Sequence, residues 1–117
     1  MIDEDTSVSR SETYAENLAV QLRKGFLAYC VLQVCSHEPV YTSDIIRKLR
    51  DAELVVVEGT IYPLLSRLQR DGLLCHEWQE SEQGPPRKYY AVTTEGREVV
   101  TLTAHKIAKL TTTLKKL

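Results

Sequence analysis

The segment EGTIYPLLSRLQRDGLL, residues 58–74, combines an apolar stripe with polar groups suited to hydrogen bonding. Ile61, Leu64, Leu65 and Leu68 recur at the spacing of a buried helical face. On a wheel of about 100° per residue, hydroxyl and guanidinium groups occupy the outer side. Such groups can donate hydrogen bonds to phosphates and base edges. Most amphipathic helices also have a polar outer face in solvent, so this helix alone does not favour contact with DNA over a solvated face. The contacts predicted from this helix are Thr60, Tyr62, Ser66, Arg67 and Arg70.

A second basic element follows in GPPRKYY, residues 84–90. Arg87 and Lys88 come directly after a Gly-Pro-Pro break, which predicts the tip of a hairpin between extended runs at about 73–80 and 87–93. The prolines reduce the entropy lost when the two cations are held in place. A stiff basic projection beside an exposed helix can reach a second groove of DNA, so the two elements together strengthen the DNA prediction.

Helices must position these groups. The first is expected from about Ser11 to Cys35, with Gly25 as the place where it would break. Thr42 or Ser43 is expected to cap a second helix, SDIIRKLRDAEL.

The third helix is expected to begin near Gly59 or Thr60, which would put Pro63 in its first turn, and to end at a left-handed Gly72. Thr94 is expected to cap a last helix. Three helices, a hairpin and a long helix predict an α+β, mostly α fold: a winged helix-turn-helix with added terminal helices.

The last helix carries a leucine-rich seam. Thr103, Ile107, Leu110, Leu114 and Leu117 recur at spacings of three and four residues, as in a short coiled coil. A helix this apolar on one face does not stand alone in water, so a partner chain is expected. The domain organisation predicted is a flexible acidic tail (1–10), a winged-helix DNA-binding domain with its leading helix (11–93) and a dimerisation helix (94–117).

Length and composition set further bounds. A chain of 117 residues with 43% apolar residues fits one soluble domain. There is no run of 18 apolar residues and the acidic start is no secretory signal, so neither a membrane span nor export is expected. Three cysteines without a CxxC pair predict free thiols in a reducing cytoplasm. Net charge is −1, so contact with DNA must depend on the local placement of cations.

Three stretches resemble the PadR-like transcriptional regulators: QLRKGFLAYCVLQVC, then YTSDIIRKLRDAELVVVEGTIYPLLSRLQRDGLL, then GPPRKYYAVTTEG. The resemblance covers about residues 17–100 and is most specific at EGTIYPLLSRL and GPPRKYY. The single C-terminal helix is similar to the short subfamily. The resemblance implies a homodimeric winged-helix repressor on a palindromic operator of double-stranded DNA. It adds Thr42 and Ser43 to the DNA contacts, and it implies a dimer interface in which Ile107, Leu110 and Leu114 pack on a partner's Leu18 and Leu22.

Some members of the family resemble sensors with an aromatic pocket at the dimer interface, in some cases lined by a tryptophan of the last helix. This chain has its one tryptophan, Trp78, on the hairpin, where it is expected to pack the wing onto the body. An aromatic small-molecule effector therefore stays open. The alternative to a DNA-binding regulator is a winged-helix protein-interaction module, which the near-zero charge also suits. His37, His76 and His105 lack metal-ligand spacing, and no nucleotide or hydrolase motif is present, so no metal, cofactor or enzymatic activity is expected.

Overall fold

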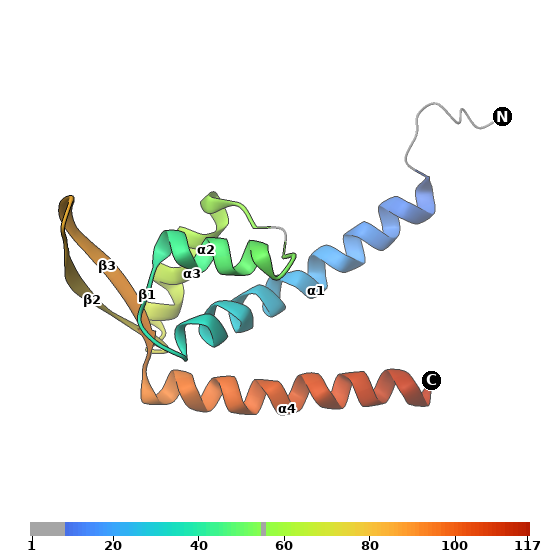
Figure 1. Ribbon diagram of the computed structural model, residues 1–117. Coiled ribbons are helices and arrows are strands. Elements are labelled where there is room, and N and C mark those ends of the chain that lie inside the picture. Colours follow the sequence, from blue (N-terminus) through green and yellow to red (C-terminus); the bar gives the residue numbers. More distant parts are fainter. Residues whose placement is uncertain (1–8, 55) are drawn as a thin grey trace.

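The computed structural model describes residues 9–54 and 56–117, and its fold is the predicted mostly helical one. A small antiparallel sheet has the strand order β1-β3-β2. Helix α1 runs below α2 and α3, α4 runs beneath α1, and the β2–β3 hairpin projects from the end of the molecule opposite to the start of α1 and the end of α4 (Figure 1). The elements in chain order are α1 (Arg10–Cys35), β1 (Val40–Tyr41), α2 (Thr42–Asp51), α3 (Glu58–Arg70), β2 (Leu74–Ser81), β3 (Gly84–Val92) and α4 (Thr94–Lys116).

The core lies between the C-terminal half of α1, the inner faces of α2 and α3, and the sheet. Helix α3 contributes its whole apolar stripe, as its spacing predicts. Burying these side chains holds α3 in one rotation about its axis, because any other rotation would expose leucines and bury arginines. The buried apolar side chains are Val31, Leu32, Cys35, Val40, Ile45, Ile46, Leu49, Val56, Ile61, Leu64, Leu65, Leu68, Leu74 and Tyr90.

Helix α1 begins one residue earlier than expected and has no break. Ser9 is the cap, and its hydroxyl accepts a hydrogen bond from the Glu12 amide at 3.0 Å. The predicted break at Gly25 is wrong, since the helix runs through it. A single glycine costs a helix only about 1 kcal/mol, which the packing of the C-terminal half outweighs. Of the predicted acidic tail, residues 1–8 lie outside the described part of the chain.

By length and mean hydropathy, α1 could cross a membrane. Its C-terminal half, however, is used for the core: Val31, Leu32 and Cys35 are buried against the other elements. The apolar character of α1 therefore has an explanation within the folded domain.

The start of each of the middle helices differs from expectation. Helix α2 follows an extended Tyr41, and no side chain caps it, so the predicted cap at Thr42 or Ser43 is wrong. Helix α3 begins at Glu58, so Pro63 lies in its second turn instead of its first. Because proline has no N–H, the carbonyl of Gly59 loses its usual helical partner.

The end of α3 is as predicted. Gly72 takes a left-handed φ of 81°, and the Leu73 amide donates to the Leu68 carbonyl at 2.9 Å. This cap turns the chain directly into β2.

The hairpin has a third strand that the sequence did not reveal. Val40 and Tyr41 pair with Tyr90 and Tyr89, so β1 ties the α1–α2 connection to β3. A strand of two residues is too short to show the alternation by which strands are recognised. Its pairing anchors the base of the wing beside the start of α2.

The cap of α4 is Thr93 and not the predicted Thr94, and a glycine contact fixes where this helix leaves the winged helix. The Thr93 hydroxyl donates to the Gly72 carbonyl at 2.7 Å and accepts from the Gly96 amide at 3.0 Å. Gly96 is buried, and a Cβ there would lie 2.1 Å from the Leu73 carbonyl oxygen. Only glycine therefore allows this approach between α4 and the start of β2.

Gly96→Ala should destabilise the domain by about 2 kcal/mol, because α4 must shift away from Leu73 to make room for the methyl group. The measurement is thermal unfolding by circular dichroism. Gly59→Ala is the matched control, since a Cβ at this helical glycine meets nothing within 4 Å. Equal melting temperatures for the two variants would contradict the proposed close contact.

Candidate nucleic-acid interface

Burial of the α3 stripe divides the polar side chains of this helix between two flanks. Tyr62, 53% exposed, and Ser66 lie on the flank toward the wing. Thr60, Arg67 and Arg70 lie on the flank toward α1. The sequence analysis placed Thr60 at the start of the helix and the other four on one outer face, but the structure separates them because α3 stands between the hairpin and α1.

The flank toward the wing forms one wall of a groove of about 400 Å³. Tyr62 and Ser66 face Trp78, Arg87 and Lys88 of the hairpin across it. This groove brings together five of the nine predicted DNA contacts: two from α3, two from the wing and Thr42 at the start of α2. Its chemistry is two hydroxyls, two cations and an indole, which together suit a sugar-phosphate backbone.

Arg87 and Lys88 reach this groove from opposite faces of β3. Neighbouring residues of a strand point to opposite sides, and Lys88 pairs with Trp78 whereas Arg87 pairs with Gln79. The Arg87 guanidinium lies 4.9 Å from the centre of the Tyr41 ring, and the Lys88 ammonium lies 5.2 Å from that of Tyr90. Each cation is held over an aromatic face, which limits its freedom without neutralising its charge.

The two DNA contacts predicted at the start of α2 differ in how far their side chains are exposed to solvent. Ser43 is exposed. Thr42 lines the groove but is only 7% exposed, so little of its side chain can reach a ligand. The reason is that α2 begins at Thr42 and turns this residue toward the core.

Trp78 is the residue of the groove that sequence reasoning misplaced. It was expected to pack the wing onto the body, but it is 64% exposed, and its ring lies in a T-shaped arrangement with that of His76 at 6.1 Å between ring centres. Its register opposite Lys88 explains the exposure, because both lie beyond the buried part of the hairpin. A register is set by pairing over the whole hairpin, which the sequence of one strand does not reveal.

Two apolar faces stand without a partner within the described chain. Leu18 and Leu22 of α1 are 57% and 75% exposed. Leu110 and Leu114 of α4 are 67% and 72% exposed, and Ile107 is half-buried. The residues predicted to form a dimer interface thus lie on the surface of the single chain.

The cysteines and histidines form no site of their own. Burial raises the pKa of the Cys30 thiol, and it raises the pKa of Cys35 to about 12, so both stay protonated at neutral pH. Cys75 is exposed and its thiol points to the Ala91 carbonyl at 3.5 Å. Within residues 9–54 and 56–117, no three acidic, histidine or cysteine side chains are grouped to hold a metal ion.

Comparison with known proteins identifies the family to which this fold belongs. A model of the Transcriptional regulator PadR-like family matches residues 31–102, which include β1, α2, α3 and the whole wing. The chain belongs to this family. Comparison with curated protein sequences gives no match.

Solved structures of the family resemble the chain over most of its length. A PadR-like transcription factor from Bacteroides fragilis is 49% identical, with 86% of this chain and 97% of that chain covered and a TM-score of 0.74. A PadR family regulator from Eggerthella lenta is 31% identical, with 91% and 93% covered and a TM-score of 0.79. A PadR-like regulator from Bacillus cereus is 35% identical, with 82% and 94% covered and a TM-score of 0.73. PadR-like proteins are DNA-binding transcriptional regulators and not enzymes, and this chain is a regulator of that kind.

Tyr62→Ala should weaken binding to duplex DNA about tenfold and leave thermal stability within about 0.5 kcal/mol, because half of this side chain is free in the groove. Fluorescence anisotropy with a labelled duplex and thermal unfolding measure the two effects. Leu65→Ala is the contrasting control, since this residue is fully buried and its loss should cost roughly 2–5 kcal/mol. A large loss of stability in Tyr62→Ala would make this tyrosine a core residue and contradict the assignment.

Proposed function

We propose that this PadR-like regulator is a homodimeric repressor that binds a palindromic operator with α3 and the wing of each protomer. The observation that carries the proposal is the groove in which Tyr62 and Ser66 of α3 face Arg87 and Lys88 of the wing. A helix and a cationic hairpin arranged side by side can follow one strand of DNA, the helix in the major groove and the wing beside it. Repression follows in the simplest way, because a protein seated on a promoter excludes the polymerase.

In this proposal the residues have separate roles. Tyr62 and Ser66 hold the edge of the major groove, Lys88 and Arg87 hold phosphates, and Ser43 contacts the backbone at the start of α2. Trp78 adds an apolar contact to the sugars between them. Thr42 supports the groove from within instead of contacting DNA. Arg67 and Arg70 reach phosphates from the other flank of α3.

Residues 10–93 then form the DNA-binding unit, and 94–117 form the dimerisation helix. Ile107, Leu110 and Leu114 are proposed to pack on the partner's Leu18 and Leu22. The support is complementarity: each set is an exposed apolar face of the chain, and burying two copies of both removes them from water. A dimer of this kind works on DNA in the cytoplasm.

An effector that relieves repression stays part of the proposal, but the aromatic dimer pocket that the family resemblance implies has no counterpart on α4. Helix α4 has no aromatic residue between Thr94 and Lys116. The seam of α4 is therefore aliphatic, which suits helix packing better than stacking on an aromatic ligand.

Arg87→Ala and Lys88→Ala should each weaken binding to a duplex selected from a random library, and each should reduce the salt slope of log Kd by about two per dimer. The slope counts phosphate contacts, and a dimer carries two copies of each cation. The slopes are measured by anisotropy titrations at several salt concentrations from about 50 to about 200 mM, the range in which such slopes are resolved. Lys115→Ala, at the end of α4, is the control and should leave the slope unchanged. Unaltered slopes in both wing variants, or selection that enriches no sequence, would favour a protein-interaction module instead.

The double variant Leu110→Asp/Leu114→Asp should convert the dimer to a monomer, since it places four charges in an apolar seam. Light scattering coupled to gel filtration measures the mass. Thr112→Asp is the matched control, because Thr112 lies on the opposite side of α4 from Leu110 and Leu114. A wild-type monomer at micromolar concentration, or an unchanged mass in the double variant, would contradict the α4 interface.

A further inference from the structure

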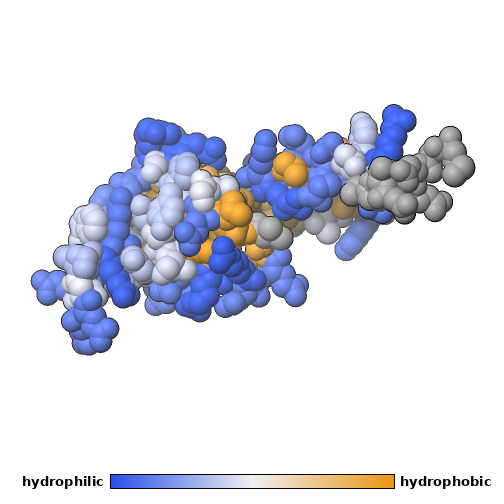
Figure 2. All heavy atoms as spheres, turned by 90° about the horizontal axis from the view of Figure 1, so that it is seen from above, coloured by the Kyte–Doolittle hydropathy of each residue, from blue (hydrophilic) through white to orange (hydrophobic). Residues whose placement is uncertain are grey.

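The wing is held to the rest of the molecule mainly at its base. Leu74 at the start of β2 and Tyr90 near the end of β3 are buried in the core, and β1 pairs with β3 only at Tyr89 and Tyr90. Farther out the hairpin is a two-stranded ribbon, and the surface at this end of the molecule is hydrophilic or intermediate when seen from above (Figure 2). A ribbon of two strands twists and bends easily, so the distance between the wing and α3 needs a further contact to fix it.

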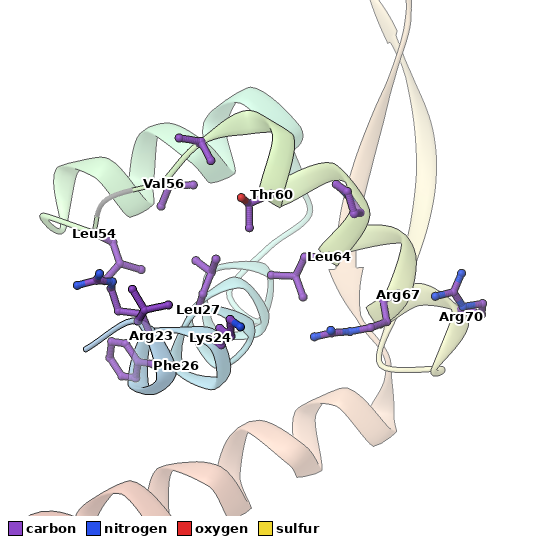
Figure 3. Close-up of a pocket in the computed structure, with 13 residues that line it drawn as sticks. Arg23, Lys24, Phe26, Leu27, Leu54, Val56, Thr60, Leu64, Arg67 and Arg70 are labelled. Atoms are coloured by element: carbon purple, nitrogen blue, oxygen red, sulfur yellow. The ribbon is translucent and has the colours of Figure 1, made fainter. Parts of the chain in front are cut away.

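The flank of α3 toward α1 does not supply this contact. A hollow of about 760 Å³ lies on that side, between α3, α1 and the α2–α3 connection. Its apolar floor includes Leu27, Leu54 and Leu64, and Lys24 and Arg67 extend toward it from the two helices (Figure 3). Because the hollow leaves this flank open, the contact that positions the wing must come from the flank that faces it.

That contact is a hydrogen bond between the last turn of α3 and β2. The amide Nε2 of Gln69 lies 2.8 Å from Nδ1 of His76, and it donates to this atom when the ring carries its proton on Nε2. Among the residues that the structure describes, this is the one side-chain hydrogen bond between α3 and the wing. At about 100° per residue, Gln69 continues the line of Tyr62 and Ser66. The hydrogen bond therefore lies at the end of the flank that forms the groove.

His76 connects α3 to the side chains of the wing that line the groove. Its ring lies 6.1 Å from that of Trp78 and 6.3 Å from that of Tyr90, measured between ring centres. The Lys88 ammonium lies 5.2 Å from the centre of the same Tyr90 ring. Trp78 and Lys88 are paired across the hairpin, and both line the groove. A shift of His76 relative to α3 therefore moves both of these groove residues.

We infer that Gln69 and His76 are positioning residues of the DNA-binding groove: their hydrogen bond sets the distance between the wing and α3, and neither residue contacts DNA. This inference rests on the proposed function and deepens it. A helix and a wing that engage the same stretch of DNA gain from being held at one separation, because the entropy of ordering the wing is then lost before DNA binds. Binding to unrelated DNA depends on the charge of the cations and needs no such match. The hydrogen bond should thus favour sequence-specific binding over non-specific binding.

Gln69→Met and His76→Phe each remove one partner of the hydrogen bond and keep a side chain of similar size. Each should lower the ratio of the affinities for a selected duplex and an unrelated duplex about fivefold, the loss expected for one hydrogen bond. The affinity for the unrelated duplex should stay within about twofold, because Arg87 and Lys88 remain. The double variant should also lose about fivefold and not about 25-fold, since the second change removes a hydrogen bond that is already lost. Fluorescence anisotropy at one salt concentration measures both affinities.

Gln79→Met is the matched control. Gln79 lies on the opposite face of the hairpin, where its amide donates to Glu77 Oε1 at 3.0 Å, so this variant should keep the wild-type ratio. Melting temperatures of the two single variants should stay within about 5 °C of wild type, because the hydrogen bond is exposed to solvent. A large loss of melting temperature, with the affinities for both duplexes falling together, would mean that the pair only stabilises the fold and would overturn the inference.

Trp78 reports on the wing without DNA, since it is the one tryptophan of the chain. Time-resolved fluorescence anisotropy of Gln69→Met, which leaves the rings of His76 and Trp78 in place, should show an added nanosecond motion of the indole. An unchanged decay or a wild-type affinity ratio would overturn the inference. Additive losses in the double variant would do so as well, because the two residues would then be separate DNA contacts. If selection enriched no DNA sequence, the proposed function would fail, and the decay would still decide whether the hydrogen bond positions the wing.

Discussion

The burial of one stripe of α3 determines most of what this molecule can do. Ile61 and Leu65 are fully buried, and Leu64 and Leu68 are nearly so. At about 25 cal/mol per Å² of apolar surface, such side chains hold the helix in one rotation more firmly than any polar contact on its outer side could. The polar side chains of α3 must then lie on one of its two flanks. The element that stands beside each flank determines which ligand that flank can bind.

One flank faces the wing and the other faces α1. The wing is placed by β1 and by the contact between Gly96 and Leu73, so Lys88 and Trp78 stand opposite Tyr62. The connection to α1 leaves a hollow edged by Lys24 and Arg67. A single buried stripe thus separates a polar groove beside the wing from a hollow that has an apolar floor and a cationic edge.

Much of the fold could be predicted from the sequence, and each wrong prediction has a local cause. The 3.6-residue period of α3 predicted its buried face, and Gly72 predicted its end. The fold class followed from the order of elements. Helix starts were missed because Tyr41 and Val57 begin α2 and α3 with no side-chain cap, so no capping residue marks them. Gly25 was misjudged because packing outweighs propensity.

The candidate site, too, could be predicted from the sequence only in part. The residue types of the groove were predicted, but the division of the α3 face into two flanks was not. A helical wheel shows which side chains point outward, and it does not show which element stands beside them. Thr42 and Trp78 were misplaced for this reason: one is covered by the turn into α2, the other is left open by the register of the hairpin. The hollow was missed altogether, since it combines residues from α1, the α2–α3 connection and α3 that are far apart in the chain.

Hydrogen–deuterium exchange of the protein with and without a selected DNA duplex tests the central claim most directly. If α3 and the wing share one DNA-binding groove, the amides of residues 60–66 and 84–90 should be protected together by DNA. The outer part of α4, residues 105–116, should exchange alike in both samples. Protection confined to α1 and α4, with α3 and the wing unchanged, would contradict the account.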